Sequence, residues 1–186
     1  MNILLIDNGS YHSDELEQAL AAYSTVRRLK YRRHTRLDQE WADVIVLSGS
    51  HRRGSFINLF LRESQLVRTT LKPVIGICYG FELIATAYGD TIKRRRAIYE
   101  GVYNVTLRPE LLGTEYRTQF KVFEAHHWVL EKTSLQALGS SERGIEAFRH
   151  PTKPIFGLQF HPEVTIPDND GKEILRRLIH YIALMR

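Results

Sequence analysis

The chain has 186 residues, a net charge of +5 and a sequence pI near 9.4. This length suits one ordinary domain that buries its core without disulfide bonds. The chain has a single cysteine, so it cannot form an internal disulfide bond. No apolar run approaches the roughly 20 residues of a membrane span, and the first residues lack the basic start of a secretory signal. We therefore expect a single domain over residues 1–186 in a cytoplasmic protein that does not enter a membrane.

The first half of the chain alternates apolar runs with helical patterns. Continuous apolar runs at 2–7, 42–49 and 73–77 predict strands that are covered on both faces, as in a parallel sheet. Each run is followed by a segment with helical spacing of apolar residues. We expect one helix after Ser13 with Leu16, Leu20 and Tyr23 inward, one over 55–70 with Phe56, Leu59, Phe60, Leu66 and Val67 inward, and one over 81–88. This order predicts an α/β fold with a doubly wound, mostly parallel central sheet in a flavodoxin-like or amidotransferase arrangement.

The second half of the chain is richer in strand-forming residues. Short β-type segments occur at 101–107, 119–124, 145–149 and 154–160, which predicts an added antiparallel portion of the sheet. The chain closes with a helical pattern over 171–184. Its inward residues are Ile174, Leu175, Leu178, Ile179 and Ile182.

Positive charge is concentrated in two segments that we expect to be surface loops. Residues 27–36 hold six Lys or Arg residues, and K-R-R-R follows at 93–96. These segments either contact an anionic partner or are solvated surfaces without a partner. Neither lies in a nucleic-acid-binding motif, so we do not expect a nucleic acid partner.

The only cysteine lies in the sequence G-I-C-Y-G, residues 76–80. This is the form of a nucleophile elbow, in which glycines on either side let a strand turn sharply into a helix. Cys78 would then stand at a helix N-terminus, which favours a thiolate, and Tyr79 would offer its backbone N–H to an oxyanion. The alternative is a small buried side chain, because free cysteine is often buried.

A histidine partner for the cysteine occurs in Q-F-H-P-E, at the end of a strand-like run. In extended structure His161 and Glu163 point to the same side, so the carboxylate can orient the imidazole. Read alone, H-P-E is equally typical of an ordinary strand-ending turn. One of the tandem histidines, His126 or His127, is expected to line the site. The other histidines are expected to bond solvent or local groups; these are His12, His34, His51, His150 and His180.

Both motifs, in this order, resemble those of the class I, or triad, glutamine amidotransferases. The runs I-L-L-I-D-N-G, V-I-V-L-S-G and P-I-F-G-L-Q-F-H-P-E-V are similar to that family along nearly the whole chain. Within the family, the chain looks most like the separate glutaminase subunit of two-chain GMP synthases. The resemblance implies that Cys78 attacks the side-chain amide of glutamine and that His161, oriented by Glu163, moves the protons. It also implies an oxyanion site at Tyr79 and Gly49, a synthetase partner that receives ammonia, and neither a cofactor nor a metal.

Two residues depart from the family pattern. The loop that commonly reads S-G-G-P is here S-G-S-H-R-R-G, which places Ser50 in the oxyanion site and His51, Arg52 and Arg53 beside it. The substrate-binding turn that usually ends in Gln ends here in Glu82, and an ionised carboxylate cannot donate a hydrogen bond.

Three functions therefore stay open at this point. The first is a glutaminase that supplies a synthetase, such as a GMP synthase. The second is a stand-alone hydrolase of a γ-glutamyl amide or peptide, which Glu82 and the altered loop suggest. The third is a non-catalytic binding module that retains the elbow as a relic.

Overall fold

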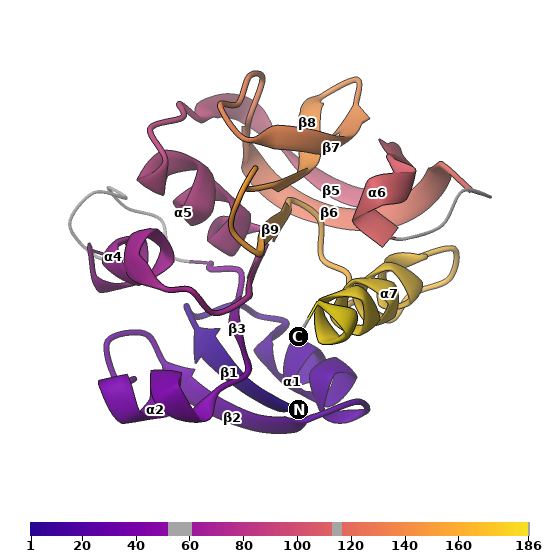
Figure 1. The fold of residues 1–186 in the computed structure, drawn as a ribbon. Helices are drawn as coiled ribbons and strands as arrows, with labels where there is room; N and C mark the ends of the chain where they lie inside the picture. Colours follow the sequence, from indigo (N-terminus) through magenta and orange to yellow (C-terminus); the bar gives the residue numbers. More distant parts are fainter. Residues whose placement is uncertain (52–60, 113–116, 186) are drawn as a thin grey trace.

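The computed structural model describes residues 1–51, 61–112 and 117–185, and one curled sheet runs through them (Figure 1). Its nine strands follow the order β2-β1-β3-β4-β9-β8-β7-β5-β6. The strands of the parallel part are β1 (Asn2–Asp7), β2 (Thr25–Lys30), β3 (Val44–Leu47), β4 (Val74–Ile77) and β9 (Ile155–Leu158). Those of the antiparallel part are β5 (Lys93–Leu107), β6 (Gln119–Val129), β7 (Gln136–Ser141) and β8 (Gly144–Arg149). The sheet thus combines parallel and antiparallel strands, as expected.

Helices cover both faces of the parallel part (Figure 1). They are α1 (Ser13–Ala21), α2 (Arg36–Trp41), α4 (Leu61–Thr69), α5 (Tyr79–Ala87) and α7 (Gly171–Leu184). The short helix α6 (Pro109–Leu112) contacts α7 and lies beside the antiparallel strands (Figure 1). Side chains alternate across β1: Ile3 and Leu5 join a core with α1 and α7, and Leu4 and Ile6 join a core with α4 and α5. Within the described ranges, no helix has both the length and the apolar surface to cross a membrane.

Most of the predicted elements are present. All five residues expected to be inward on 171–184 are buried in α7, and Leu66 and Val67 are buried in α4. Phe56, Leu59 and Phe60 lie outside the described residues. The prediction for Tyr23 is wrong: α1 ends at Ala21, so Tyr23 falls beyond the helix and is 52% exposed.

The basic segments are loops only in part, which corrects the expectation for 27–36 and 93–96: residues 31–35 form the connection between β2 and α2, and the others lie in β2, α2 and β5. Residues 25–30 form β2, an edge strand whose free side tolerates polar side chains, and Lys93 begins β5. Arg28 of β2 binds Asp7 at 2.8 Å and also bonds Asp14 and Glu17. Part of this positive charge is therefore neutralised within the chain.

The strand β7 was not predicted, because its sequence Q-A-L-G-S-S has a weak strand pattern. Its glycine is required by packing. A Cβ on Gly139 would lie 2.5 Å from Leu107 Cδ2 and 2.9 Å from Ala147 Cβ. Glycine is unfavourable in a strand by sequence pattern, yet Gly139 is the residue that lets β5 and β8 approach β7 closely.

Backbone contacts are also close where β4 turns into α5. A Cβ on Gly76 would lie 2.5 Å from the carbonyl carbon and oxygen of Gly80. A Cβ on Gly80 would lie 2.4 Å from the carbonyl oxygen of Leu47 on β3. Only glycine fits at both positions, which is the steric requirement that the G-x-C-x-G pattern predicts.

We predict that Gly76→Ala lowers the free energy of unfolding by at least about 2 kcal/mol, because the added methyl group overpacks a backbone contact. Urea unfolding followed by circular dichroism measures the change. The control is Leu71→Ala, at a side chain that is 85% exposed, where a change within about 0.5 kcal/mol is expected. Equal stability of Gly76→Ala and the wild type would contradict the packing argument.

Candidate active site

Cys78 stands between the end of β4 and the start of α5 in a strained conformation, with φ 50° and ψ −104°. A non-glycine residue in such a conformation costs on the order of 1–3 kcal/mol and persists only where its surroundings hold it. Here the backbone N–H of Cys78 donates to the Leu158 carbonyl on β9 at 2.8 Å, and the two glycines fix the turn. The side chain is 5% exposed and lies at the carboxyl edge of the parallel strands.

His161 and Glu163 follow β9 and meet Cys78 at this edge. The His161 Nδ1 atom lies 2.8 Å from Glu163 Oε1, and both side chains are buried. Because a carboxylate accepts, Nδ1 carries the proton, and Nε2 is left to face the thiol. His161 also lies close enough to Cys78 for each side chain to shift the pKa of the other. The structure thus brings together the three residues that the sequence proposed as a triad.

Burial sets the resting protonation of this pair. It raises the pKa of the Cys78 thiol, although the nearby His161 opposes that change. The raised pKa of Cys78 differs from the sequence-based expectation, in which the helix N-terminus favours a thiolate. Burial also disfavours the imidazolium of His161, but Cys78 and Glu163 outweigh it and raise the His161 pKa well above its ordinary value. His161 is therefore basic enough to accept a proton from the neighbouring Cys78 thiol.

Gly49 lies directly against Cys78 and His161. A Cβ on this residue would be 3.0 Å from His161 Cε1 and 3.5 Å from Cys78 Cβ. Ser50 follows it in a half-buried position, and Tyr79 is the first residue of α5, beside the thiol. Arg52 and Arg53 of the same loop lie outside the described residues.

Glu82 is one turn along α5 from the nucleophile and is 3% exposed. Gln159 Nε2 donates to Glu82 Oε1 at 3.4 Å. Burial raises the Glu82 pKa to about 7, against the opposing effects of His126, Gln159 and His161. Near neutral pH a large fraction of Glu82 is therefore protonated, and a protonated carboxyl can donate a hydrogen bond as a glutamine amide does.

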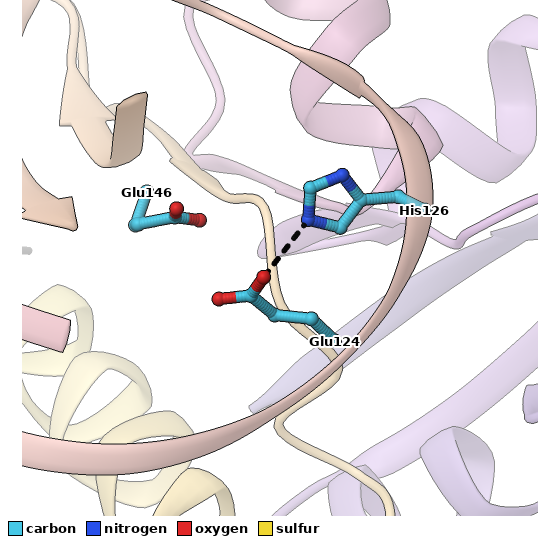
Figure 2. Close-up of side chains that lie close together, drawn as sticks. All are labelled: Glu124, His126 and Glu146. Carbon is cyan, nitrogen blue, oxygen red and sulfur yellow. Dashed lines mark hydrogen bonds and ion pairs between the residues drawn. The ribbon is translucent and has the colours of Figure 1, made fainter. Parts of the chain in front are cut away.

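His126 lies on β6 with both ring nitrogens beside protein atoms. Its Nδ1 is 2.7 Å from the Trp128 carbonyl, and its Nε2 is 3.3 Å from Glu124 Oε2 (Figure 2). Burial disfavours the charged ring, but Glu124 outweighs this effect and raises the His126 pKa. His126 and Glu82 also influence each other electrostatically. His126 thus lies behind Glu82 in a buried group of charges.

Two side chains near the triad were missed by sequence reasoning. The His12 ring lies 5.1 Å from that of His161, and the Phe123 ring lies 6.4 Å from it. The signal for His12 was its place after the first strand, because residues that follow parallel strands gather at one edge. His34 is also more than a surface residue: it is buried, with Nε2 3.3 Å from Glu63 Oε1.

Comparison with known proteins identifies relatives along most of the chain. The family model described as glutamine amidotransferase class-I matches residues 4–181. One subunit of the glutamine-hydrolysing GMP synthase of Methanosarcina barkeri is 31% identical over 146 residues, which is 75% of this chain and 74% of that protein. The corresponding subunit of Methanocaldococcus jannaschii is 36% identical over 108 residues, 56% of this chain and 57% of that protein. The match to the GMP synthase of Borreliella burgdorferi, 29% identical, spans only 28% of that protein.

Solved structures share the fold. A Thermoplasma acidophilum protein, provisionally described as one subunit of a GMP synthase, has a TM-score of 0.85 at 23% identity, with 100% of this chain and 96% of that chain covered. A Thermotoga maritima glutamine amidotransferase has a TM-score of 0.70 at 19% identity, with 100% and 83% covered. At these identities the likeness shows the fold, a mixed α/β architecture with parallel and antiparallel strands.

We predict that Glu163→Gln lowers the pKa of His161, because the variant removes a negative charge that stabilises the imidazolium. An NMR titration of the ring protons measures it, with the exposed His180 on α7 as the internal control that should not change. An unchanged or higher His161 pKa in the variant would contradict the assigned contact.

Proposed function

Because the chain belongs to the class I glutamine amidotransferase family, we propose that it hydrolyses the side-chain amide of glutamine to glutamate and ammonia. The observation that carries the proposal is the meeting of Cys78 with the hydrogen-bonded pair His161 and Glu163 at the carboxyl edge of the sheet. A cysteine nucleophile with a histidine base and an orienting carboxylate is the constellation that acyl transfer needs.

In the first half of the reaction, the thiol proton passes to His161 as Cys78 Sγ attacks the amide carbon of glutamine. The carbonyl oxygen becomes an oxyanion, which we assign to the backbone N–H groups of Tyr79 and of the Gly49–Ser50 segment. The tetrahedral species collapses when the carbon–nitrogen bond breaks. His161 gives its proton to the leaving nitrogen, so ammonia departs and a thioester remains on Cys78.

In the second half, water attacks the thioester. His161 accepts a proton from the water, a second tetrahedral species forms, and the carbon–sulfur bond breaks. The proton returns to Cys78, glutamate leaves, and the resting thiol is restored. Glu163 keeps the His161 ring in one orientation throughout.

The pocket for the amino acid end of glutamine is assigned to Glu82, with His126 behind it. The family departure at Glu82 matters less than the sequence indicated, because a protonated carboxyl restores a hydrogen-bond donor. We propose that His126 acts on the substrate through Glu82, since both of its ring nitrogens lie beside protein atoms.

We further propose that ammonia passes to a synthetase partner, as the names of the matched GMP synthase subunits suggest. A cytoplasmic location suits this role, and no nucleic acid partner is proposed. The test is glutamate release measured with the chain alone and with candidate synthetases added. Absence of glutamate release under every condition would overturn the proposal.

Two further assignments about the architecture are proposals. The parallel strands follow the order β2-β1-β3-β4-β9, which supports the flavodoxin-like, doubly wound description of this part of the sheet. The single sheet through the described residues supports one domain over 1–186.

A second candidate function is hydrolysis of a γ-glutamyl amide or peptide without a partner. Glu82 favours it, because the ionised form of this carboxyl would hold the amino acid end of a substrate differently. A panel of γ-glutamyl substrates distinguishes the two functions: turnover without a partner that exceeds glutamine turnover would favour the second.

We predict that Cys78→Ala reduces glutamine hydrolysis to an undetectable level while the protein remains folded, because the nucleophile is removed. Glu163→Gln should lower kcat/KM less, by about 10²–10⁴-fold, because it affects only the orientation and charge of His161. Glutamate release and circular dichroism measure both effects. Normal turnover by folded Cys78→Ala would place the chemistry elsewhere.

We predict that Glu82→Gln changes the pH dependence of KM for glutamine. In the wild type, Glu82 loses its proton as the pH rises through about 7, so KM should rise above that pH. The amide of the variant does not titrate, so this rise should be absent.

Stability provides an independent check on the Glu82 assignment. A carboxyl whose pKa is raised by folding loses its stabilising contribution as the pH rises from the unfolded value, near 4.5, to about 7. Glu82→Gln should therefore gain stability relative to the wild type as the pH is raised from 5 to 8. A constant difference across that range would contradict the raised pKa.

A further inference from the structure

Two acidic residues and a histidine lie together in the interior of the protein. Glu124 and His126 share one face of β6, and Glu146 comes from β8 (Figure 2). All three are buried, and one ligand atom from each lies within 4.8 Å of the others. The strands β6 and β8 are not neighbours in the sheet, so the curl of the sheet brings these residues together.

The contacts of His126 indicate that a cation lies between its ring and Glu124. The Nδ1 atom must donate to the Trp128 carbonyl, because a carbonyl oxygen only accepts. In the neutral ring, Nε2 then presents a lone pair to Glu124 Oε2 at 3.3 Å, where two acceptors face each other. A proton or a metal ion must lie between them. Two ligand atoms of a tetrahedral zinc ion are also about 3.3 Å apart, given bonds of about 2.0 Å.

Glu146 supplies an independent observation that points into the same space. Its Oε1 atom accepts a 2.6 Å hydrogen bond from Ser141 Oγ. Its Oε2 atom is buried without a hydrogen-bond partner, and the residue is 1% exposed. A buried carboxylate oxygen without a donor is costly, and a cation would satisfy it.

The charge of the surroundings also suits a cation. Arg143 binds both oxygens of Glu124, at 2.9 and 3.0 Å, and neutralises one carboxylate. When Glu146 is ionised, the two carboxylates and the one guanidinium leave a net charge of −1. A cation bound at Glu146 offsets that buried negative charge.

A cavity lies near this group. A cavity of about 430 Å³ opens beside β5 and β7, and Tyr103, Ser141 and Arg143 are among its lining residues. Ser141 bonds Glu146 and Arg143 bonds Glu124, so the cavity reaches to within one side chain of the three residues.

We propose that Glu124, His126 and Glu146 bind one divalent metal ion of the zinc type. A histidine that donates its other ring N–H to a backbone carbonyl is the arrangement seen around metal-bound imidazoles. The mixture of one imidazole with two carboxylates fits zinc or a similar first-row ion better than magnesium or calcium. The ion would tie β6 to β8. The proposal is independent of glutamine hydrolysis.

The test uses the full chain carrying Cys78→Ala, because the thiol and His161 of the wild type could bind zinc themselves. The protein is treated with a chelator, dialysed and titrated with zinc chloride by calorimetry. We expect one equivalent of zinc to bind at micromolar or lower concentration and the melting temperature to rise with the zinc concentration. A second substitution, Glu146→Gln, should weaken binding at least about 100-fold, because a ligand is lost. The matched control is Glu100→Gln, at an exposed carboxylate on β5, which should bind as tightly as its parent.

Two results would overturn the proposal. One is the absence of zinc binding by the folded parent, which would mean that protons hold the three side chains together. The other is equal binding by folded Glu146→Gln, which would place the zinc elsewhere. If Glu146→Gln does not fold, anomalous diffraction from zinc-soaked crystals of the parent decides: the proposal requires a peak between the three side chains.

Discussion

A positive φ at Cys78, and the two glycines that make room for it, fix the position of the nucleophile. The strand β4 must turn into α5 within one residue, and Gly76 and Gly80 allow the backbones to touch where any side chain would collide. The same turn places the thiol at the edge where β9 ends. His161 follows β9 at this edge, and Glu163, two residues further along the chain, binds its ring. The site thus forms because β4 and β9 end side by side, just before Cys78 and His161.

Burial governs the chemistry at this edge. It keeps the Cys78 thiol protonated at rest, and it raises the pKa of Glu82 to about 7. A thiol beside a basic histidine becomes a nucleophile when the proton moves, and a buried carboxyl near its pKa serves as a donor in place of an amide. The environment of Cys78 and Glu82 thus fits the roles that we propose for them.

The features that could be predicted from sequence are those governed by local rules. The elbow glycines have a steric pattern of fixed spacing, and His161 and Glu163 are two residues apart on one strand end. The strand β2 was missed, because an edge strand tolerates charged residues that patterns assign to loops. The closeness of Glu124 and Glu146 could not be predicted either. It joins strands that are not neighbours and depends on the curl of the whole sheet.

The proposed reaction requires that Cys78 forms a covalent bond with the substrate. Mass spectrometry of the protein quenched in acid during glutamine turnover can detect that bond. We expect a glutamyl group on the peptide that contains Cys78, present during turnover and absent once glutamine is exhausted. Steady release of glutamate with no adduct on that peptide, or with an adduct on another residue, would contradict the mechanism.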